Sequence, residues 1–262
     1  MSDLLEAYED GVVLFTFNRP ERANALSGPL MQELHKRLLE IATDDRVGAV
    51  VITGAGKAFC AGGDVKGMSE RSRFDEAEET AISGLRSRME VSRLLHEMPK
   101  PTIAMVNGAA AGAGMSLALA CDLRFAGRSA RFVTAFAKIA VSGDFGGSYF
   151  LSRLVGRAKA LELYLTSAPV LADEALGLGV VDRVYDDVAL REATINFAKE
   201  LASGPRVAFG FIKQNLNLAE TASLPEFLDA EARRMVRSRR TEDHKEGVRA
   251  FVEKRKPVFK GR

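Results

Sequence analysis

The segment from Val106 to Gly114 could do chemistry with its backbone alone. It reads VNGAAAGAG and joins an apolar run to a helix-forming sequence that begins at Met115. Such small side chains let a ligand approach the backbone closely. The first N–H groups of a helix have no partner within the helix and lie at the positive end of its dipole. We expect a site for an anion, or for an oxygen that becomes anionic during a reaction, although such loops also serve tight strand–helix packing.

Asp144 is the second candidate for chemistry. It lies in the segment VSGDFGG, residues 141–147, with glycine on both sides. Glycines let the chain bend, which can bring a carboxylate close to a ligand. An aspartate in an apolar pocket can take up and return a proton, because desolvation raises its pKa. Since Asp and Gly are also common in turns, a loop-capping role is the alternative.

Alternating strands and helices must position these groups. Apolar runs at 12–17, 48–53, 102–106 and 123–126 predict strands. Ser27-Gly28-Pro29 predicts a helix start, the region 69–96 is helix-like, and residues 58–63 form a small-residue loop. This order predicts an α/β core with largely parallel strands over residues 1–203. Residues 204–262 carry only helical patterns, and no repeat is visible in the sequence.

Composition excludes several classes of function. The chain has 262 residues, 47% hydrophobic and 27% charged, as is usual for a soluble globular protein. Its net charge of +2 gives no reason to expect a nucleic-acid or membrane partner, and no run of ~20 apolar residues predicts a membrane span. The two cysteines and the lack of a secretory leader favour the cytoplasm. No metal, nicotinamide or flavin signature is present, so no permanently bound cofactor is expected.

Four separated segments together resemble the enoyl-CoA hydratase/isomerase (crotonase) superfamily. They are NRPERANAL at 18–26, AFCAGGDV at 58–65, the block 101–122, and EGVRAFVEKR at 246–255. Their order and spacing match over nearly the whole chain. The resemblance implies a crotonase-like spiral of ββα units with a C-terminal helical trimerisation region, assembled as a homotrimer or as a dimer of trimers.

The resemblance also implies a coenzyme A thioester as substrate. In this family two backbone N–H groups polarise the thioester carbonyl and form an oxyanion hole. Those positions fall on Gly63 and Ala113. Contacts to coenzyme A fall on the following residues: Ala23, Ala25, Ala61 and Asp64, with Phe251 and Lys254 reaching it from a neighbouring subunit in many members.

Two glutamates that hold and activate water in the hydratases of this family are missing here. Their positions fall on Ser116 and Phe136. Asp144, in contrast, matches a position that holds a catalytic aspartate in some relatives. With Ser116, the aromatic residues Phe132, Phe136 and Phe145 are expected to line the acyl pocket, although core packing is an equally good reading of the three rings. Asp122 is expected to be a structural acid at a helix–strand junction.

Four activities remain open at this point. An acyl-CoA isomerase, in which Asp144 moves a proton between the α and γ carbons, is the favoured hypothesis. A hydratase would need Asp144 or an unaligned acid to activate water. A thioester hydrolase or dehalogenase would act through Asp144, but the histidine that the family uses in dehalogenation falls on Met89. A protein that binds CoA esters without turnover is the fourth.

Overall fold

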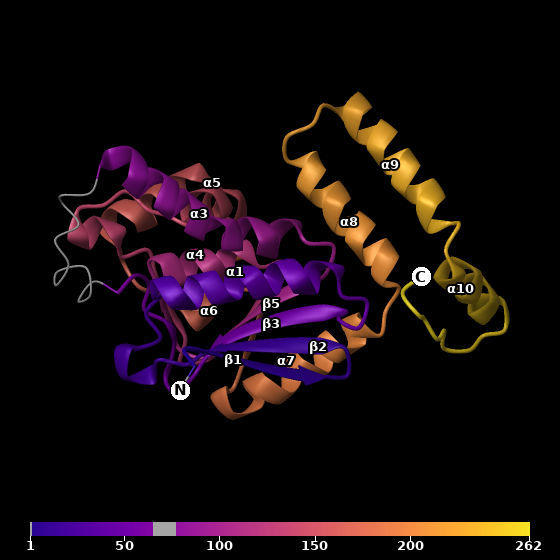
Figure 1. Ribbon diagram of the computed structural model, residues 1–262, viewed down its shortest axis with the longest axis horizontal. Coiled ribbons are helices and arrows are strands. Elements are labelled where there is room, and N and C mark those ends of the chain that lie inside the picture. Colours follow the sequence, from indigo (N-terminus) through magenta and orange to yellow (C-terminus); the bar gives the residue numbers. More distant parts are fainter. Residues whose placement is uncertain (1, 65–76) are drawn as a thin grey trace.

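Two sheets form the core of the computed structural model, which describes residues 2–64 and 77–262 (Figure 1). The six-stranded sheet has an antiparallel edge strand and is otherwise parallel; its order is β1 (Leu4–Glu9), β2 (Val12–Phe17), β3 (Ala49–Gly54), β5 (Thr102–Val106), β7 (Leu123–Gly127) and β10 (Arg183–Tyr185). The smaller sheet has the order β4 (Ala58–Cys60), β6 (Ala109–Ala111), β8 (Arg131–Val133) and β9 (Val170–Leu171).

Three successive ββα units connect the two sheets. In each unit one strand joins the large sheet, the next joins the small sheet, and a helix follows. The units are β3–β4–α3, β5–β6–α4 and β7–β8–α5, with α3 at Glu78–Glu97, α4 at Ala113–Ala120 and α5 at Gly147–Thr166. Strands β4, β6 and β8 are parallel neighbours, so their carboxyl ends meet at one edge of the small sheet. The loops that leave this edge carry the candidate site residues.

Both faces of the large sheet are covered by helices, because successive side chains along a strand point to opposite faces and both sets are apolar. In β2, Val13, Phe15 and Phe17 face a core shared with α1 (Gly28–Thr43), whereas Val12 and Leu14 face a second core shared with α7 (Asp187–Ala202). Every residue of β3 and β5 is buried, as expected for parallel strands between helical layers.

The last helices leave this core. Helices α8 (Arg206–Ala219), α9 (Leu224–Ser238) and α10 (Glu242–Val252) extend away from the sheets (Figure 1). The chain end folds back on α10, where the buried Asp243 accepts hydrogen bonds from the N–H groups of Lys260 and Gly261 at 2.6 and 2.8 Å. Three short helices also lie in the described ranges: η1 (Pro20–Arg22), η3 (Phe136–Ile139) and α6 (Ala172–Gly177).

The sequence predicted the long elements better than the short ones. The strands at 12–17 and 102–106 and the helix start at Ser27 are confirmed, since the Ser27 hydroxyl caps α1 by accepting the Leu30 N–H at 3.2 Å. The loop predicted at 58–63 is wrong at its start, because residues 58–60 form strand β4. The Gly/Ala segment likewise contains strand β6. Part of the helix-like region, 69–76, lies outside the described residues. No helix in the described ranges is long and apolar enough to cross a membrane.

Candidate active site

The loop after β4 and the start of α4 lie against each other. The Ala61 N–H donates to the Ala23 carbonyl at 2.9 Å and the Leu26 N–H donates to the Gly62 carbonyl at 2.8 Å, which fixes the loop by backbone hydrogen bonds. A Cβ on Gly62 would lie 3.3 Å from the Ala113 nitrogen. The structure therefore places the loop 61–63 next to Ala113 at the start of α4, although the two lie far apart in the sequence.

Both predicted donors have a free N–H group in the part of the chain that the structure describes. Ala113 is the first residue of α4, where the helix offers no acceptor to its N–H. Neither the Gly63 nor the Ala113 N–H donates a hydrogen bond within residues 2–64 and 77–262. Two such donors beside each other, one at a helix N-terminus, can hold an oxygen that gains negative charge.

The residues predicted to bind coenzyme A at the N-terminal side surround the same loop. Ala23, which has φ 48°, follows η1 and accepts the hydrogen bond from Ala61. The Ala25 carbonyl accepts a hydrogen bond from Arg19 at 2.7 Å. Asp64 forms ion pairs with Arg19 at 3.1 Å and with Arg22 at 3.2 Å. Its carboxylate thus fastens the loop to Arg19 and Arg22.

The loop that carries Asp144 rests on two stacked aromatic rings. Phe136 and Tyr164 lie nearly parallel, with ring centroids 5.9 Å apart and planes inclined by 6°. A Cβ on Gly143 would lie 3.2 Å from Tyr164 Cε1 and 3.7 Å from Phe136 Cδ2. A Cβ on Gly112 would lie 3.8 Å from Phe136 Cε1. The Phe136 ring therefore lies close both to Gly112 at the start of α4 and to the loop that carries Asp144.

The carboxyl of Asp144 is half-buried in surroundings that raise its pKa. Burial raises its pKa from 3.8 to about 6, and the positive charge of Arg88 on α3 acts in the opposite direction. Its buried Oδ1 atom has no hydrogen-bond partner within the described chain. An acid or base with a pKa near neutrality exchanges protons most effectively at physiological pH. The raised pKa agrees with the expectation from the sequence.

The other predicted pocket residues differ in their positions. Ser116 is buried, and its hydroxyl donates to the Gly112 carbonyl at 3.2 Å, one turn earlier on α4. Phe132 and Phe145 are buried within the main hydrophobic core, so packing accounts for both rings. Phe136, in contrast, lies between Gly112 and Gly143. Among these three rings it is the one that lies close both to the start of α4 and to the loop that carries Asp144.

Phe251 and Lys254 are not brought to this site within one chain. Phe251 lies near the end of α10 with 86% of its surface exposed, and Lys254 follows it with a φ of 53°. Helix α10 lies beyond α8 and α9, away from the sheets (Figure 1). Their predicted contact with coenzyme A stays a prediction that needs a second subunit.

Sequence reasoning missed Tyr164 and Arg88. Tyr164 lies near the end of α5, after a kink at Gly156, and it contacts the Asp144 loop although twenty residues separate them in the sequence. Arg88 is one of several arginines on α3; Arg86 and Arg93 pair with Glu90, whereas Arg88 is half-buried and acts on Asp144. No local pattern distinguishes either residue, and only their positions in space do.

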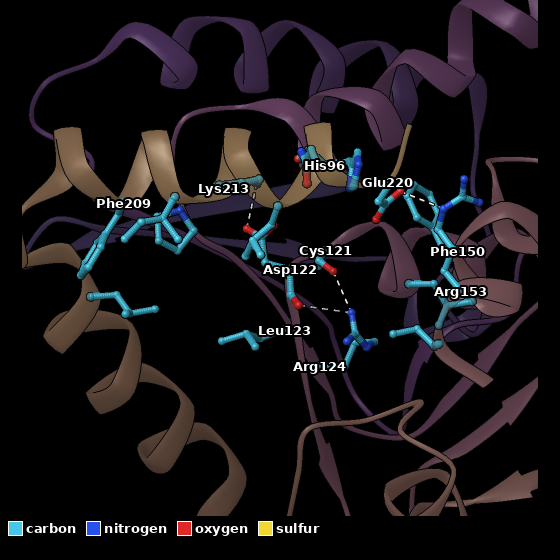
Figure 2. A pocket seen from close by; sticks show the side chains of 17 residues that line it. His96, Cys121, Asp122, Leu123, Arg124, Phe150, Arg153, Phe209, Lys213 and Glu220 are labelled. Atoms are coloured by element: carbon cyan, nitrogen blue, oxygen red, sulfur yellow. Dashed lines mark hydrogen bonds and ion pairs between the residues drawn. The ribbon is translucent and has the colours of Figure 1, made fainter. Parts of the chain in front are cut away.

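A cavity of about 400 Å³ lies elsewhere, between α8 and the core (Figure 2). Its wall includes Lys213, whose ammonium group donates to Asp122 Oδ2 and to the Leu95 carbonyl, both at 2.8 Å. Asp122 also accepts the Thr102 N–H at 2.8 Å. The expectation that Asp122 is a structural acid between α4 and β7 is therefore confirmed.

Comparisons with known proteins agree with this architecture. The enoyl-CoA hydratase/isomerase family model matches residues 7–262. The chain is 38% identical over 262 residues to 1,2-epoxyphenylacetyl-CoA isomerase from Escherichia coli, with all of both chains covered. It is 35% identical over 257 residues to the short-chain-enoyl-CoA hydratase of Clostridium acetobutylicum, covering 98% of this chain and 97% of that one.

Solved structures show the same fold. A putative enoyl-CoA hydratase from Streptomyces coelicolor superposes with a TM-score of 0.95 at 34% identity, covering 100% of this chain and 95% of that chain. A putative enoyl-CoA hydratase/isomerase from Mycobacterium abscessus gives a TM-score of 0.92 at 35% identity, covering 99% and 100%. The chain belongs to the enoyl-CoA hydratase/isomerase family, with the crotonase fold, and it is an enzyme of that family. Its relatives are named both as isomerases and as hydratases.

Proposed function

We propose that this enzyme is an isomerase that shifts the double bond of an enoyl-CoA thioester. The observation that carries the proposal is the half-buried Asp144 carboxyl, which has a pKa of about 6 and an Oδ1 atom with no hydrogen-bond partner among the described residues. The Phe136 ring lies close both to Gly112, next to the donor Ala113, and to Gly143, next to Asp144. A 1,3-proton shift needs one group that takes a proton at one carbon and returns it at another. A lone carboxyl of this kind is suited to that task.

In the proposed reaction the N–H groups of Gly63 and Ala113 hold the thioester oxygen of a 3-enoyl-CoA. The Asp144 carboxylate removes a proton from the α carbon, and the electrons of that C–H bond move into a dienolate whose negative charge lies on the held oxygen. Asp144 then returns the proton to the γ carbon, which leaves the double bond between the α and β carbons. No atom is gained or lost, and each donor contributes about 3–4 kcal/mol to stabilising the enolate.

The name of one relative and the stacked rings of Phe136 and Tyr164 support an unsaturated or cyclic acyl-CoA as the substrate of the proposed isomerase. The Escherichia coli relative is named 1,2-epoxyphenylacetyl-CoA isomerase. Phe136 and Tyr164 form a flat surface beside Asp144, and flat, unsaturated or cyclic acyl groups stack well on such a surface. Coenzyme A would enter as part of the substrate and leave with the product, as expected from the predicted contacts at Ala23, Ala25, Ala61 and Asp64.

We further propose a homotrimer, or a dimer of trimers, built through the C-terminal helices. Large apolar side chains lie exposed there, including Ile212 at 53% and Leu216 at 66% on α8. Exposed apolar surface of this kind is typical of an interface between subunits. Assembly would allow Phe251 and Lys254 to reach the coenzyme A of a neighbouring subunit. A cytoplasmic location is proposed with it, since Cys60 and Cys121 are both unpaired.

Hydration of a 2-enoyl-CoA is the second candidate, favoured by relatives that are named hydratases. It would require Asp144 to activate water. Hydrolysis or dehalogenation through Asp144, and binding without turnover, have no comparable support.

The test offers the purified enzyme a 3-enoyl-CoA and a 2-enoyl-CoA of equal chain length. The absorbance of the conjugated thioester reports both reactions. A rise with the 3-enoyl substrate and little loss with the 2-enoyl substrate would establish isomerisation. Rapid loss from the 2-enoyl substrate would establish hydration and overturn the proposal.

A further inference from the structure

Tyr164 is more closely tied to the Asp144 loop than its place in the sequence indicates. Its ring edge lies under Gly143, where a Cβ would come within 3.2 Å of Cε1. Its hydroxyl lies at the other end of the same loop, where a Cβ on Gly147 would lie 2.5 Å from it and 2.2 Å from Ser116 Oγ. The loop thus packs against Tyr164 at both ends. At Gly143 and at Gly147 the contact is too close for a larger side chain.

The hydroxyl of Tyr164 is held in place rather than free to react. It lies against Ser116, whose own hydroxyl donates to the Gly112 carbonyl at 3.2 Å. Burial, together with the nearby Asp144 carboxyl, raises the pKa of the Tyr164 phenol to about 12. The phenol therefore keeps its proton near neutral pH and is no base. What it offers the site is a fixed hydroxyl and a broad apolar ring.

We propose that Tyr164 is a positioning residue that keeps water away from the Asp144 carboxyl and thereby favours proton transfer over the addition of water. The inference rests on the function proposed above and names what restricts that site to isomerisation. The stacked pair of Phe136 and Tyr164 covers the loop from one side, and Ser116 with Gly147 closes the space beside it. On this side the loop therefore contacts protein side chains rather than solvent.

The physical basis is the desolvation of one carboxyl. Burial is the largest cause of the raised pKa of Asp144, and among the described residues Arg88 from α3 and Tyr164 from α5 are the charged or titratable groups that interact with it. If the Tyr164 ring is removed, water enters beside the carboxyl and its pKa falls toward the ordinary value. A hydrated carboxylate is a weaker base toward carbon, and the water beside it becomes available as a nucleophile.

The test compares Tyr164→Ala with Tyr164→Phe. For Tyr164→Ala we expect the acidic limb of the pH–rate profile to move down by about one unit or more. The ratio of hydrated product to isomerised product from a 2-enoyl-CoA should rise about tenfold. Tyr164→Phe keeps the ring, so its pH profile and product ratio should stay close to those of the wild type. The same substitutions at Tyr149, an exposed residue at the start of α5 that bonds Glu220 at 2.9 Å, are the matched controls.

An unchanged pH limb and product ratio in folded Tyr164→Ala would overturn the inference, as would equal shifts in the Tyr149 controls. Melting curves report folding, and Tyr164→Leu, which retains more of the apolar volume, replaces the alanine variant if that variant does not fold. Asp144→Asn separates this inference from the proposed function. If Asp144→Asn keeps full activity, the proposed function fails; if it loses activity while Tyr164→Ala behaves as the wild type, only the role of Tyr164 fails.

Discussion

The candidate site has an oxyanion side and an acid side, which use different chemical groups. The oxyanion side consists of backbone N–H groups in loops of small residues, fixed by hydrogen bonds such as Gly112 N–H to the Val133 carbonyl at 2.9 Å. The acid side consists of four side chains: Phe136 from η3, Asp144 from the loop that follows η3, Tyr164 from α5 and Arg88 from α3. Because a backbone donor is available from nearly any residue, the first side can be shared by many reactions. We expect the second side to decide which reaction follows.

Removing the acid should have the largest effect. Asp144→Asn keeps the shape of the side chain but cannot take up a proton, so kcat for isomerisation should fall about 10³-fold, within the range of general base catalysis. Steady-state kinetics with a 3-enoyl-CoA measure it, and Asp45→Asn, at an exposed aspartate, serves as control. Wild-type turnover in Asp144→Asn would show that another residue is the base and that Asp144 does not belong to the acid side.

Removing one backbone donor should have a smaller effect. Ala113→Pro deletes the N–H at the first position of α4, which is the helix position that best tolerates proline. We expect kcat to fall about 10²-fold, the usual loss for one oxyanion donor. Ala113→Gly retains the N–H and should remain near the wild-type rate. Equal rates in the two variants would mean that this donor takes no part in the reaction.

Changing the charge beside the acid should have the smallest effect. Arg88 lowers the pKa of Asp144, so Arg88→Met should raise that pKa above about 6. Since the base must be ionised, the rate rises with pH through this pKa, and the acidic limb should move to higher pH. The rate at pH 6 should drop a few-fold, about what a shift of half a pKa unit produces, with little change at pH 8.

Arg86→Met is the matched control for this prediction. Arg86 lies on the same helix but is exposed and paired with Glu90. A limb that moves equally in both variants would show that the net charge of α3, and not Arg88 itself, acts on the carboxyl. If the acidic limb moves in neither variant, Arg88 has no influence on the Asp144 carboxyl and does not belong to the acid side.

The sequence predicted more of the oxyanion side than of the acid side. Its small residues and helix start are consecutive in the chain. A site for an anionic oxygen could therefore be predicted from the local sequence at Gly108, Gly112 and Ala113. Asp144 stood out through its flanking glycines. Tyr164 and Arg88 did not, because nothing near them in the chain differs from an ordinary helix. The three-residue strands β4, β6 and β8 were also missed, since alternation cannot be detected over so few residues.

By itself the sequence determined the α/β class, the long strands and helices, and the residue types able to hold an oxyanion and move a proton. Hydrophobic periodicity and helix-start signals act over a few residues, and so they can be read in order along the chain. Only the tertiary structure showed that Gly63, Ala113 and Asp144 follow the small-sheet strands of three successive ββα units. The parallel pairing of β4, β6 and β8 brings these loops to one edge, and the burial that this creates sets the pKa of Asp144.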